Sequence, residues 1–390
     1  MYKGHTVAVV VTAYNEAGFV GEVIETLPGF VDRAYVVDDA STDGTWAEVM
    51  RYAAVADGGA PVRESADATT GSGTVTASGS GTVTDAEDPT DVDAATGATA
   101  PTRDGHDRAE DRPFVVSIRH EQNRGVGAAI VTGYRRAYED DMDVVAVMNG
   151  DGQMDPEILD RIVDPVVEGR ADYAKGNRLL SREHTRGMGA WRRFGNGCLT
   201  LLTKAASGYW KTMDPQNGYT AISREAIGAL DLDSLYDRYG FLNDLLVSLN
   251  TRGMRVADVE MRALYADEES SISYSSFIPR VSRLLVSSFL RRLTLRYLVN
   301  DFNPLVGLYA IGILGPLVGF LQAGLLVATG VAPVRAASTA LTVGVVSAVA
   351  LVLAMTLDAM ANEHLETRDL TDDRPDPRRH GSRSLGPSDD

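Results

Sequence analysis

Residues 6–27 read Thr-Val-Ala-Val-Val-Val-Thr-Ala-Tyr-Asn-Glu-Ala-Gly-Phe-Val-Gly-Glu-Val-Ile-Glu-Thr-Leu. The β-branched run at Thr6–Thr12 predicts a buried strand, and the pattern over Glu16–Leu27 predicts a helix. A short polar loop separates them. Strand, polar loop and helix in this order form the repeating unit of a doubly wound α/β sheet, in which ligands bind beyond the carboxyl ends of the strands.

The same alternation continues along the chain. Further strands are predicted at 34–38, 115–119, 144–148 and 172–175, and further helices at 45–54, 126–138 and 157–167. Asp155 is the predicted N-cap of the last of these helices, with Pro156 at its first position. We therefore expect an α/β domain built on a mostly parallel sheet.

The charge balance limits the classes of partner. The 390 residues include 54 acidic and 37 basic side chains, which gives a formal net charge of -17. This charge argues against general nucleic-acid binding. Few of the basic residues are lysine, and this bias, with the many carboxylates, indicates a protein from a halophilic archaeon. The single cysteine, Cys198, excludes an intrachain disulfide and a cysteine-based metal cluster.

Residues 57–112 differ in composition from the rest of the predicted domain, which spans residues 1–265. Gly, Ser, Thr, Ala and Asp dominate the segment, and the sequence Gly-Ser-Gly-Thr-Val-Thr occurs at 71–76 and again at 79–84. Too few large apolar residues are present to offset the entropy of ordering the chain. The composition predicts a disordered, acidic, low-complexity insertion whose role stays open.

The C-terminal third has the composition of a membrane anchor. Residues 305–329 and 336–357 contain no charged side chain, and each exceeds the ~20 residues that span a bilayer as a helix. We predict a two-helix transmembrane hairpin over 304–360. Arginines among Leu, Val and Phe at 276–300 predict basic amphipathic interfacial helices. The positive-inside bias then predicts a multi-pass protein of the cell membrane, with the N-terminal domain and a polar tail at 361–390 in the cytoplasm.

Polar side chains follow three of the predicted strands. They are Ala-Tyr-Asn-Glu at 13–16, Asp-Asp-Ala-Ser-Thr-Asp-Gly-Thr at 38–45 and Asn-Gly-Asp-Gly-Gln-Met-Asp-Pro at 149–156. Strand-end carboxylates accept hydrogen bonds from a ribose or a base, although the same residue types favour turns and helix caps. The third segment also offers oxygen ligands to Mg²⁺ or Mn²⁺, which use one or two carboxylates together with substrate phosphates.

These three segments and Asn-Arg-Gly-Val-Gly-Ala-Ala at 123–129 resemble, in order, the motifs of the family 2 glycosyltransferases of the GT-A fold. The resemblance implies a Rossmann-like GT-A domain, a nucleoside-diphosphate sugar donor and a divalent cation. It places nucleotide-sugar binding at Ala13, Tyr14, Glu16, Asp39, Arg124 and Gly127. It places the cation at Asp151 and Gln153. Asn149 stands where the family usually has an Asp and brings no charge, so it is the weaker ligand candidate.

The second half of the domain resembles the polyprenyl- and dolichyl-phosphate hexosyltransferases. The similar segments are 176–178 (Gly-Asn-Arg), 192–196 (Arg-Arg-Phe-Gly-Asn) and 214–219 (Asp-Pro-Gln-Asn-Gly-Tyr). The resemblance implies transfer of a hexose, with inversion, to dolichyl phosphate. Arginine forks suit phosphate oxygens, and the implied acceptor ligands are Arg178, Arg193 and Asn196. A donor of the UDP-glucose or GDP-mannose type, and a product used in N-glycosylation of S-layer protein, are implied in the same way.

Asp244 stands where many members of the family have an acidic base. A phosphate acceptor is already ionised near neutral pH, so we expect Asp244 to orient a neighbouring arginine or to cap a helix. A hydroxyl acceptor on a lipid-linked glycan would instead need Asp244 as its base. That enzyme is one alternative, and a non-catalytic membrane scaffold for other glycosylation enzymes, favoured by Asn149, is another. No Gln-x-x-Arg-Trp motif occurs, which favours single addition over polymerisation.

Overall fold

The computed structural model describes residues 1–56, 114–178, 190–261, 274–300 and 302–369. Within these residues an eight-stranded sheet runs in the order β3-β2-β1-β4-β6-β5-β7-β8. The strands are β1 (Val7–Ala13), β2 (Arg33–Asp38), β3 (Val115–Arg119), β4 (Val144–Asn149), β5 (Tyr173–Asn177), β6 (Thr220–Ser223), β7 (Val256–Glu260) and β8 (Glu366–Asp369). Among the strands of the described residues, only β6 pairs antiparallel to its neighbours, β4 and β5. The predicted mostly parallel α/β fold is confirmed.

The register of the sheet brings the predicted polar loops to one edge. Ala13 of β1 lies opposite Asp38 of β2, and Thr12 lies opposite Asn149 of β4. The pairing extends past the strand ends, because the Gly150 N–H donates to the Thr12 carbonyl (2.8 Å). The segments that follow β1, β2 and β4 therefore start side by side.

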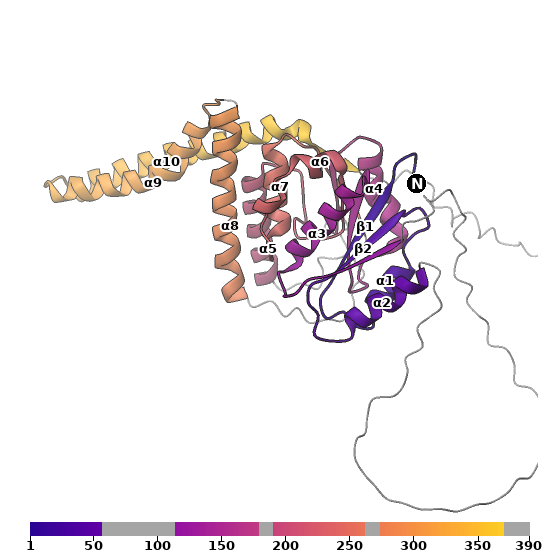
Figure 1. Cartoon of the computed structure of the whole chain (residues 1–390). Coiled ribbons are helices and arrows are strands. Elements are labelled where there is room, and N and C mark those ends of the chain that lie inside the picture. Colours follow the sequence, from indigo (N-terminus) through magenta and orange to yellow (C-terminus); the bar gives the residue numbers. More distant parts are fainter. Residues whose placement is uncertain (57–113, 179–189, 262–273, 301, 370–390) are drawn as a thin grey trace, which may run out of the picture.

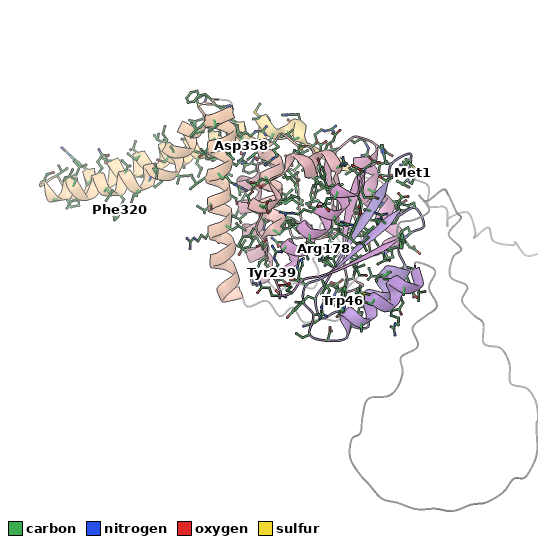
Figure 2. All side chains as sticks on the ribbon, viewed as in Figure 1. Met1, Trp46, Arg178, Tyr239, Phe320 and Asp358 are labelled. Atoms are coloured by element: carbon green, nitrogen blue, oxygen red, sulfur yellow. The ribbon has the colours of Figure 1, made fainter. Side chains whose placement is uncertain are left out.

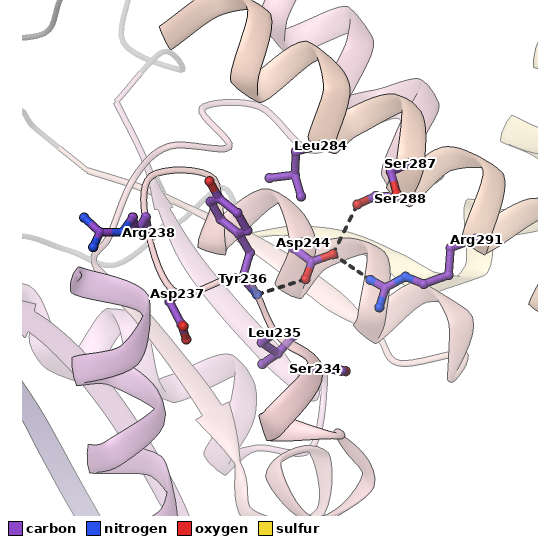
Figure 3. Close-up of a pocket in the computed structure, with 10 residues that line it drawn as sticks. All are labelled: Ser234, Leu235, Tyr236, Asp237, Arg238, Asp244, Leu284, Ser287, Ser288 and Arg291. Atoms are coloured by element: carbon purple, nitrogen blue, oxygen red, sulfur yellow. Dashed lines mark hydrogen bonds and ion pairs between the residues drawn. The ribbon is translucent and has the colours of Figure 1, made fainter. Parts of the chain in front are cut away.

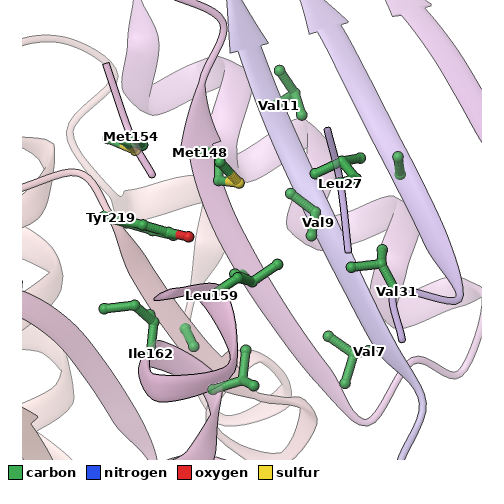
Figure 4. Packing of buried hydrophobic residues seen from close by; sticks show 14 of the residues in the cluster. Val7, Val9, Val11, Leu27, Val31, Met148, Met154, Leu159, Ile162 and Tyr219 are labelled. Atoms are coloured by element: carbon green, nitrogen blue, oxygen red, sulfur yellow. The ribbon is translucent and has the colours of Figure 1, made fainter. Parts of the chain in front are cut away.

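Helices cover both faces of the sheet, and the central strands are accordingly apolar throughout. One face packs against α1 (Val20–Glu25), α2 (Thr45–Ala56) and α4 (Leu159–Val167), with Val7, Val9 and Val11 of β1 at the centre of the cluster (Figure 4). The other face packs against α3 (Val126–Glu139), α6 (Arg224–Ala229) and α7 (Phe241–Thr251). Two further helices, α5 (Ala190–Ser207) and α8 (Tyr274–Thr294), lie beyond α7 and contact it.

Two long apolar helices project from the domain as a hairpin. They are α9 (Leu305–Ala328) and α10 (Pro333–Asn362), and α8 lies crosswise to them (Figure 1). Glycines allow their close approach, since a Cβ at Gly312 would lie 2.7 Å from Leu351 Cβ. Outward side chains such as Phe320, which is 74% exposed, are apolar (Figure 2). Each helix has the length and composition needed to cross a bilayer.

After the hairpin the chain returns to the sheet. A short 3-10 helix, η5 (Glu363–Leu365), leads into β8, which pairs in parallel with β7 and places Glu366 opposite Val256. Leu365 is buried in the core beside α7. Residues 361–369 therefore belong to the fold and not to the polar tail predicted from residue 361, because burial and strand pairing hold them. Residues 370–390 and the predicted insertion at 57–112 lie outside the described residues.

Candidate functional site

The loops that follow β1 and β2 are joined by hydrogen bonds. Asn15 has a left-handed backbone (φ 57°), and its side-chain oxygen accepts the Thr42 N–H (2.9 Å). The Glu16 N–H donates to the Thr45 hydroxyl (2.8 Å). Asparagine tolerates this conformation better than most residues do. The backbone of the first motif is thus fixed, while the Tyr14 side chain remains 44% exposed.

Asp39 is engaged by the protein itself. It is 3% exposed, and its two oxygens accept the backbone N–H groups of Arg124 (2.9 Å) and Gly125 (2.7 Å). His120 Nδ1 lies 2.7 Å from the same carboxylate, and its Nε2 lies 2.9 Å from the hydroxyl of Thr132. Asp39 therefore positions the turn at residues 123–125. Its predicted contact with the nucleotide stays a prediction.

The glycines of the third motif permit close packing. Gly125 has φ 100°, and a Cβ there would lie 2.7 Å from the Asp237 carbonyl oxygen. A Cβ at Gly127 would lie 2.6 Å from the Tyr236 carbonyl oxygen. The N-terminus of α3 is consequently held between Asp39 and residues 236–237. The Ala128 N–H donates to the Asp237 carbonyl (3.1 Å). The nucleotide-sugar contacts that the resemblance implies for Arg124 and Gly127 stay predictions.

The fourth motif offers a small set of oxygen donors at the end of β4. Asp151 is half-buried, and its carboxylate accepts the Gln153 N–H (3.0 Å) across a turn in which Gly152 has φ 70°. Asp155 caps the short helix η1 (Pro156–Ile158) by accepting the Glu157 N–H (2.9 Å), as predicted.

The donor set at this turn fits a divalent cation that takes its remaining ligands from a substrate. Among the described residues no group of three or more His, Cys, Asp or Glu side chains is placed to hold a metal. One carboxylate with neighbouring amide oxygens suits Mg²⁺ or Mn²⁺ only when phosphate oxygens complete the coordination. Asp151, Gln153 and Asn149 remain the predicted ligands.

Arg178 follows β5 and is held by a carboxylate from a later segment. Its Nε and Nη2 donate to the two oxygens of Asp214 (2.8 and 3.1 Å), and its backbone N–H donates to the same carboxylate (3.2 Å). The Arg178 side chain is 40% exposed, whereas that of Asp214 is 8% exposed. Burial opposes ionisation of Asp214, but the guanidinium outweighs it and lowers the pKa of this carboxyl group.

The segment 214–219 connects Arg178 with the fourth motif. Its first residue, Asp214, binds Arg178, and a Cβ at Gly218 would lie 3.4 Å from Asn149 Oδ1. The hydroxyl of Tyr219 donates to the Asp155 carbonyl (2.9 Å). The structure thus brings the predicted acceptor arginine and the predicted metal motif to the same loop. Arg193 and Asn196 lie in α5, and their side chains fall outside the described residues.

Asp244 faces α8. It is 4% exposed, and it accepts hydrogen bonds from Arg291 Nη2 (2.6 Å), the Ser288 hydroxyl (3.2 Å) and the Tyr236 N–H (3.2 Å) (Figure 3). These groups line a cavity of about 510 Å³ between α8 and residues 234–238. The contacts agree with the expectation that Asp244 orients an arginine.

Several residues of the site were not predicted from the sequence. His120 and Glu366 bind groups that lie far away in the chain, and nothing in their own segments marks them. Arg291 was predicted only as part of a basic interfacial helix, and it binds Asp244 instead. For Lys175 the sequence does contain a clue to a buried ion pair. A lysine within a buried strand needs a partner carboxylate, and Asp258 Oδ1 lies 3.2 Å from its Nζ.

Known proteins resemble this chain over part of its length. The UDP-N-acetylglucosamine–dolichyl-phosphate N-acetylglucosaminyltransferase of Methanococcus voltae is 29% identical over 153 residues, which are 39% of this chain and 61% of that protein. The polyprenol monophosphomannose synthase of Mycolicibacterium smegmatis is 30% identical over 172 residues, which are 42% of this chain and 61% of that protein. The matches thus span less than two thirds of these relatives.

Among solved structures, glucosyl-3-phosphoglycerate synthase from Mycobacterium tuberculosis in complex with Mn²⁺, UDP and glucosyl-3-phosphoglycerate has a TM-score of 0.45 and 18% identity. The match covers 74% of this chain and 80% of that chain. The sequence profile of Glycosyl transferase family 2 matches residues 8–69 and 97–230, and the gap between them falls inside the predicted insertion. These matched residues make up just over half of the chain and contain all four motifs, so the chain belongs to glycosyl transferase family 2.

Proposed function

We propose that the chain transfers a hexose from a nucleoside-diphosphate sugar to dolichyl phosphate at the cytoplasmic face of the membrane. The observation that carries the proposal is the shared loop at 214–219, which binds Arg178 at one end and lies against Asn149 at the other. A cationic fork beside the metal motif matches an anionic acceptor placed next to a nucleotide diphosphate.

Two halves of the site have separate roles in this proposal. The donor side consists of the segments 13–16, 38–45, 123–127 and 149–156, where Tyr14, Glu16 and the N-terminus of α3 would bind the nucleotide sugar. Asp151 and Gln153 would hold Mg²⁺ or Mn²⁺, which when bound stabilises the charge of the departing nucleoside diphosphate.

The acceptor side consists of Arg178, residues 210–219 and β8. Arg178, with Arg193 and Asn196 of α5, would bind the lipid phosphate so that one of its oxygens attacks the anomeric carbon. That oxygen carries charge near neutral pH, and no residue has to remove a proton. The Asp244–Arg291 pair (2.6 Å) therefore favours a phosphate acceptor over a hydroxyl on a lipid-linked glycan.

The lipid, the membrane orientation, the donor sugar and the use of the product are proposed from the sequence and from the relatives. The names of the Methanococcus voltae and Pyrococcus furiosus relatives contain dolichyl or dolichol phosphate, and the halophilic composition agrees with an archaeal lipid. The hairpin of α9 and α10 would anchor the enzyme beside its acceptor, with the domain in the cytoplasm. We propose a donor of the UDP-glucose or GDP-mannose type, transfer with inversion, and use of the product in N-glycosylation of S-layer protein.

The test is transfer of labelled hexose in membranes. Membranes that contain the chain would be incubated with labelled UDP-glucose or GDP-mannose and dolichyl phosphate, followed by lipid extraction. Label should enter an acid-labile lipid phosphate, and only with added dolichyl phosphate and Mg²⁺ or Mn²⁺. Label in a lipid-linked glycan would favour the hydroxyl-acceptor enzyme. Absence of both transfer and donor hydrolysis, with and without Mn²⁺, would favour a non-catalytic scaffold.

A further inference from the structure

The strand that follows the hairpin binds the acceptor side through one carboxylate. Glu366 of β8 is 8% exposed. Its oxygens accept three consecutive backbone N–H groups, from Trp210 (2.7 Å), Lys211 (2.6 Å) and Thr212 (2.9 Å). Burial raises the pKa of Glu366, and these three donors act in the opposite direction. Three N–H groups converging on one buried carboxylate fix the path of residues 210–212.

The next two residues, Met213 and Asp214, are held by the buried pair of Asp258 and Lys175. The Met213 N–H donates to Asp258 Oδ2 (2.8 Å). Lys175 Nζ lies 3.2 Å from the other oxygen of Asp258 and donates to the Asp214 carbonyl (3.1 Å). Each residue from 210 to 214 is therefore bound through its backbone to a charged side chain. A shift at 210–212 would be transmitted along this run, because its members are consecutive in the chain.

Asp214 is the last residue of the segment 210–214 and the one that contacts Arg178. Its backbone has φ 50°, a conformation that is uncommon for non-glycine residues and that Asp, like Asn, tolerates better than most. Its carboxylate orients Arg178 through two guanidinium bonds. The direction of the Arg178 fork hence depends on the position of residues 210–213.

The hairpin contributes a second contact at Trp210. The indole N–H of Trp210 donates to Asp358 Oδ2 of α10 (3.4 Å). The same carboxylate forms an ion pair with Arg292 of α8 (2.8 Å) in which neither side chain is exposed. Asp358 lies at the base of the hairpin, where it meets the domain (Figure 2). The backbone N–H and the indole N–H of Trp210 therefore both bind carboxylates from the C-terminal part of the chain.

We propose that Glu366 is a positioning residue for the acceptor: the strand that follows the membrane hairpin holds residues 210–214, and through Asp214 it sets the orientation in which Arg178 receives the lipid phosphate. This inference rests on the proposed function and adds to it a coupling between the membrane anchor and the acceptor side. Donor binding should be independent of Glu366, because no donor-side contact described above involves β8.

The experiment compares Glu366→Gln with the control Glu363→Gln in the full-length protein in membranes. Glutamine keeps one acceptor oxygen and replaces the other with an NH₂ donor, so it cannot accept from both sets of backbone N–H groups and residues 210–212 should shift. Glu363 binds the Lys211 side chain from an exposed position (2.9 Å; 65% exposed), and its loss should change nothing. We expect Glu366→Gln to raise the KM for dolichyl phosphate about 10-fold or more, since a displacement of ~1 Å can cost on the order of 100-fold. The KM for the nucleotide sugar and donor hydrolysis should stay within about twofold.

A double-mutant cycle with Arg178→Ala separates positioning from loss of stability. If Glu366 acts through Arg178, Glu366→Gln should have little further effect on acceptor kcat/KM in the Arg178→Ala background. Independent, multiplicative effects would overturn the inference. An unchanged acceptor KM, or equal losses for donor and acceptor, would do the same.

If Glu366→Gln fails to fold, a second variant still tests the inference. Glu366→Asp keeps the charge on a shorter side chain, and it should raise the acceptor KM while leaving the donor KM unchanged. No change in acceptor KM for this variant would again overturn the inference. Failure of the proposed function is distinct, because the unmodified protein would then transfer no hexose to dolichyl phosphate.

Discussion

The donor side and the acceptor side are held together by different kinds of contact. On the donor side, backbone N–H groups bind short side chains of neighbouring loops, such as Thr42 to Asn15. On the acceptor side, ion pairs and buried carboxylates join segments that lie far apart in the chain, such as Glu366 and Trp210, which are 156 residues apart. The difference teaches that the described donor-side contacts come from the sheet and its own connecting loops, whereas the acceptor side also depends on the return of the chain from the hairpin.

The largest expected effect is a loss of folding stability at the base of the hairpin, where Arg292 pairs with Asp358. Arg292→Ala leaves Asp358 buried without its cation, and breaking such a pair costs about 3–5 kcal/mol of folding free energy. Thermal unfolding in detergent measures the loss. The control is Arg224→Ala, which removes an ion pair with Asp141, a residue that is 82% exposed, and should cost at most about 1 kcal/mol. Equal stability of the two variants would contradict a role for the buried pair.

The second largest effect is a loss of hexose transfer caused by a change on the donor side. Asp151→Ala should reduce transfer on the order of 100- to 1000-fold, because charge on the leaving diphosphate loses its stabilisation. The fold should survive, since Asp151 is a half-buried turn residue. Transfer assays with saturating donor measure the loss, and circular dichroism checks the fold. Asn149→Asp is the matched variant and should be tolerated. Near-full activity of Asp151→Ala would refute the predicted metal ligand.

A smaller effect isolates the acceptor side. Arg178→Ala removes a charge-assisted phosphate contact worth about 1.5–3 kcal/mol, which corresponds to roughly 10- to 150-fold in transfer. Donor hydrolysis by water should fall much less, because the nucleotide and metal residues are unchanged. Arg178→Lys should restore only part of the activity, since a point charge cannot replace a planar fork. Equal losses of transfer and hydrolysis would mean that Arg178 serves the donor instead.

The pair of Asp214 with Arg178 should also appear in the pH dependence of stability. The folded-state pKa of Asp214 is lowered, so its ionisation stabilises the fold above the unfolded value of ~3.9. That contribution is lost as the pH falls through the lowered pKa. Wild type should therefore be more stable than Asp214→Asn near neutral pH, and the difference should shrink below about pH 4. A difference that is constant with pH, in chemical denaturation, would contradict the ion pair.

The smallest expected effect concerns Asp244. Asp244→Asn keeps the size of the side chain and an acceptor oxygen for Arg291. Transfer to dolichyl phosphate should therefore change by only about threefold, because the proposed mechanism asks no proton transfer of Asp244 and a retained neutral hydrogen bond is worth ~1 kcal/mol. Transfer is measured beside Arg178→Ala. A severe defect in Asp244→Asn with an unaffected Arg178→Ala would reverse the assignment and favour a hydroxyl acceptor with Asp244 as base.

The sequence by itself determined the alternation of strands and helices, the apolar hairpin and the strand-end position of the four motifs. Hydrophobic periodicity and turn residues are local properties, so the segment at 6–16 could be assigned without knowing its neighbours. Parallel pairing then brings strand ends to one edge whatever the details of packing. For this reason the strand-end positions of Asp151 and Arg178 could be predicted from the sequence, whereas their proposed roles came from the family resemblance.

Only the tertiary structure decided which partner each buried charge takes. Asp39 binds the 123–125 turn, Asp244 turns to Arg291, and Glu366 returns to the sheet to bind residues 210–212. A carboxylate in a sequence is compatible with a metal ligand, a base, a cap or an ion pair, because these roles use the same chemical group. The choice among them depends on which distant donors lie within about 3 Å after folding, and no local pattern encodes that distance.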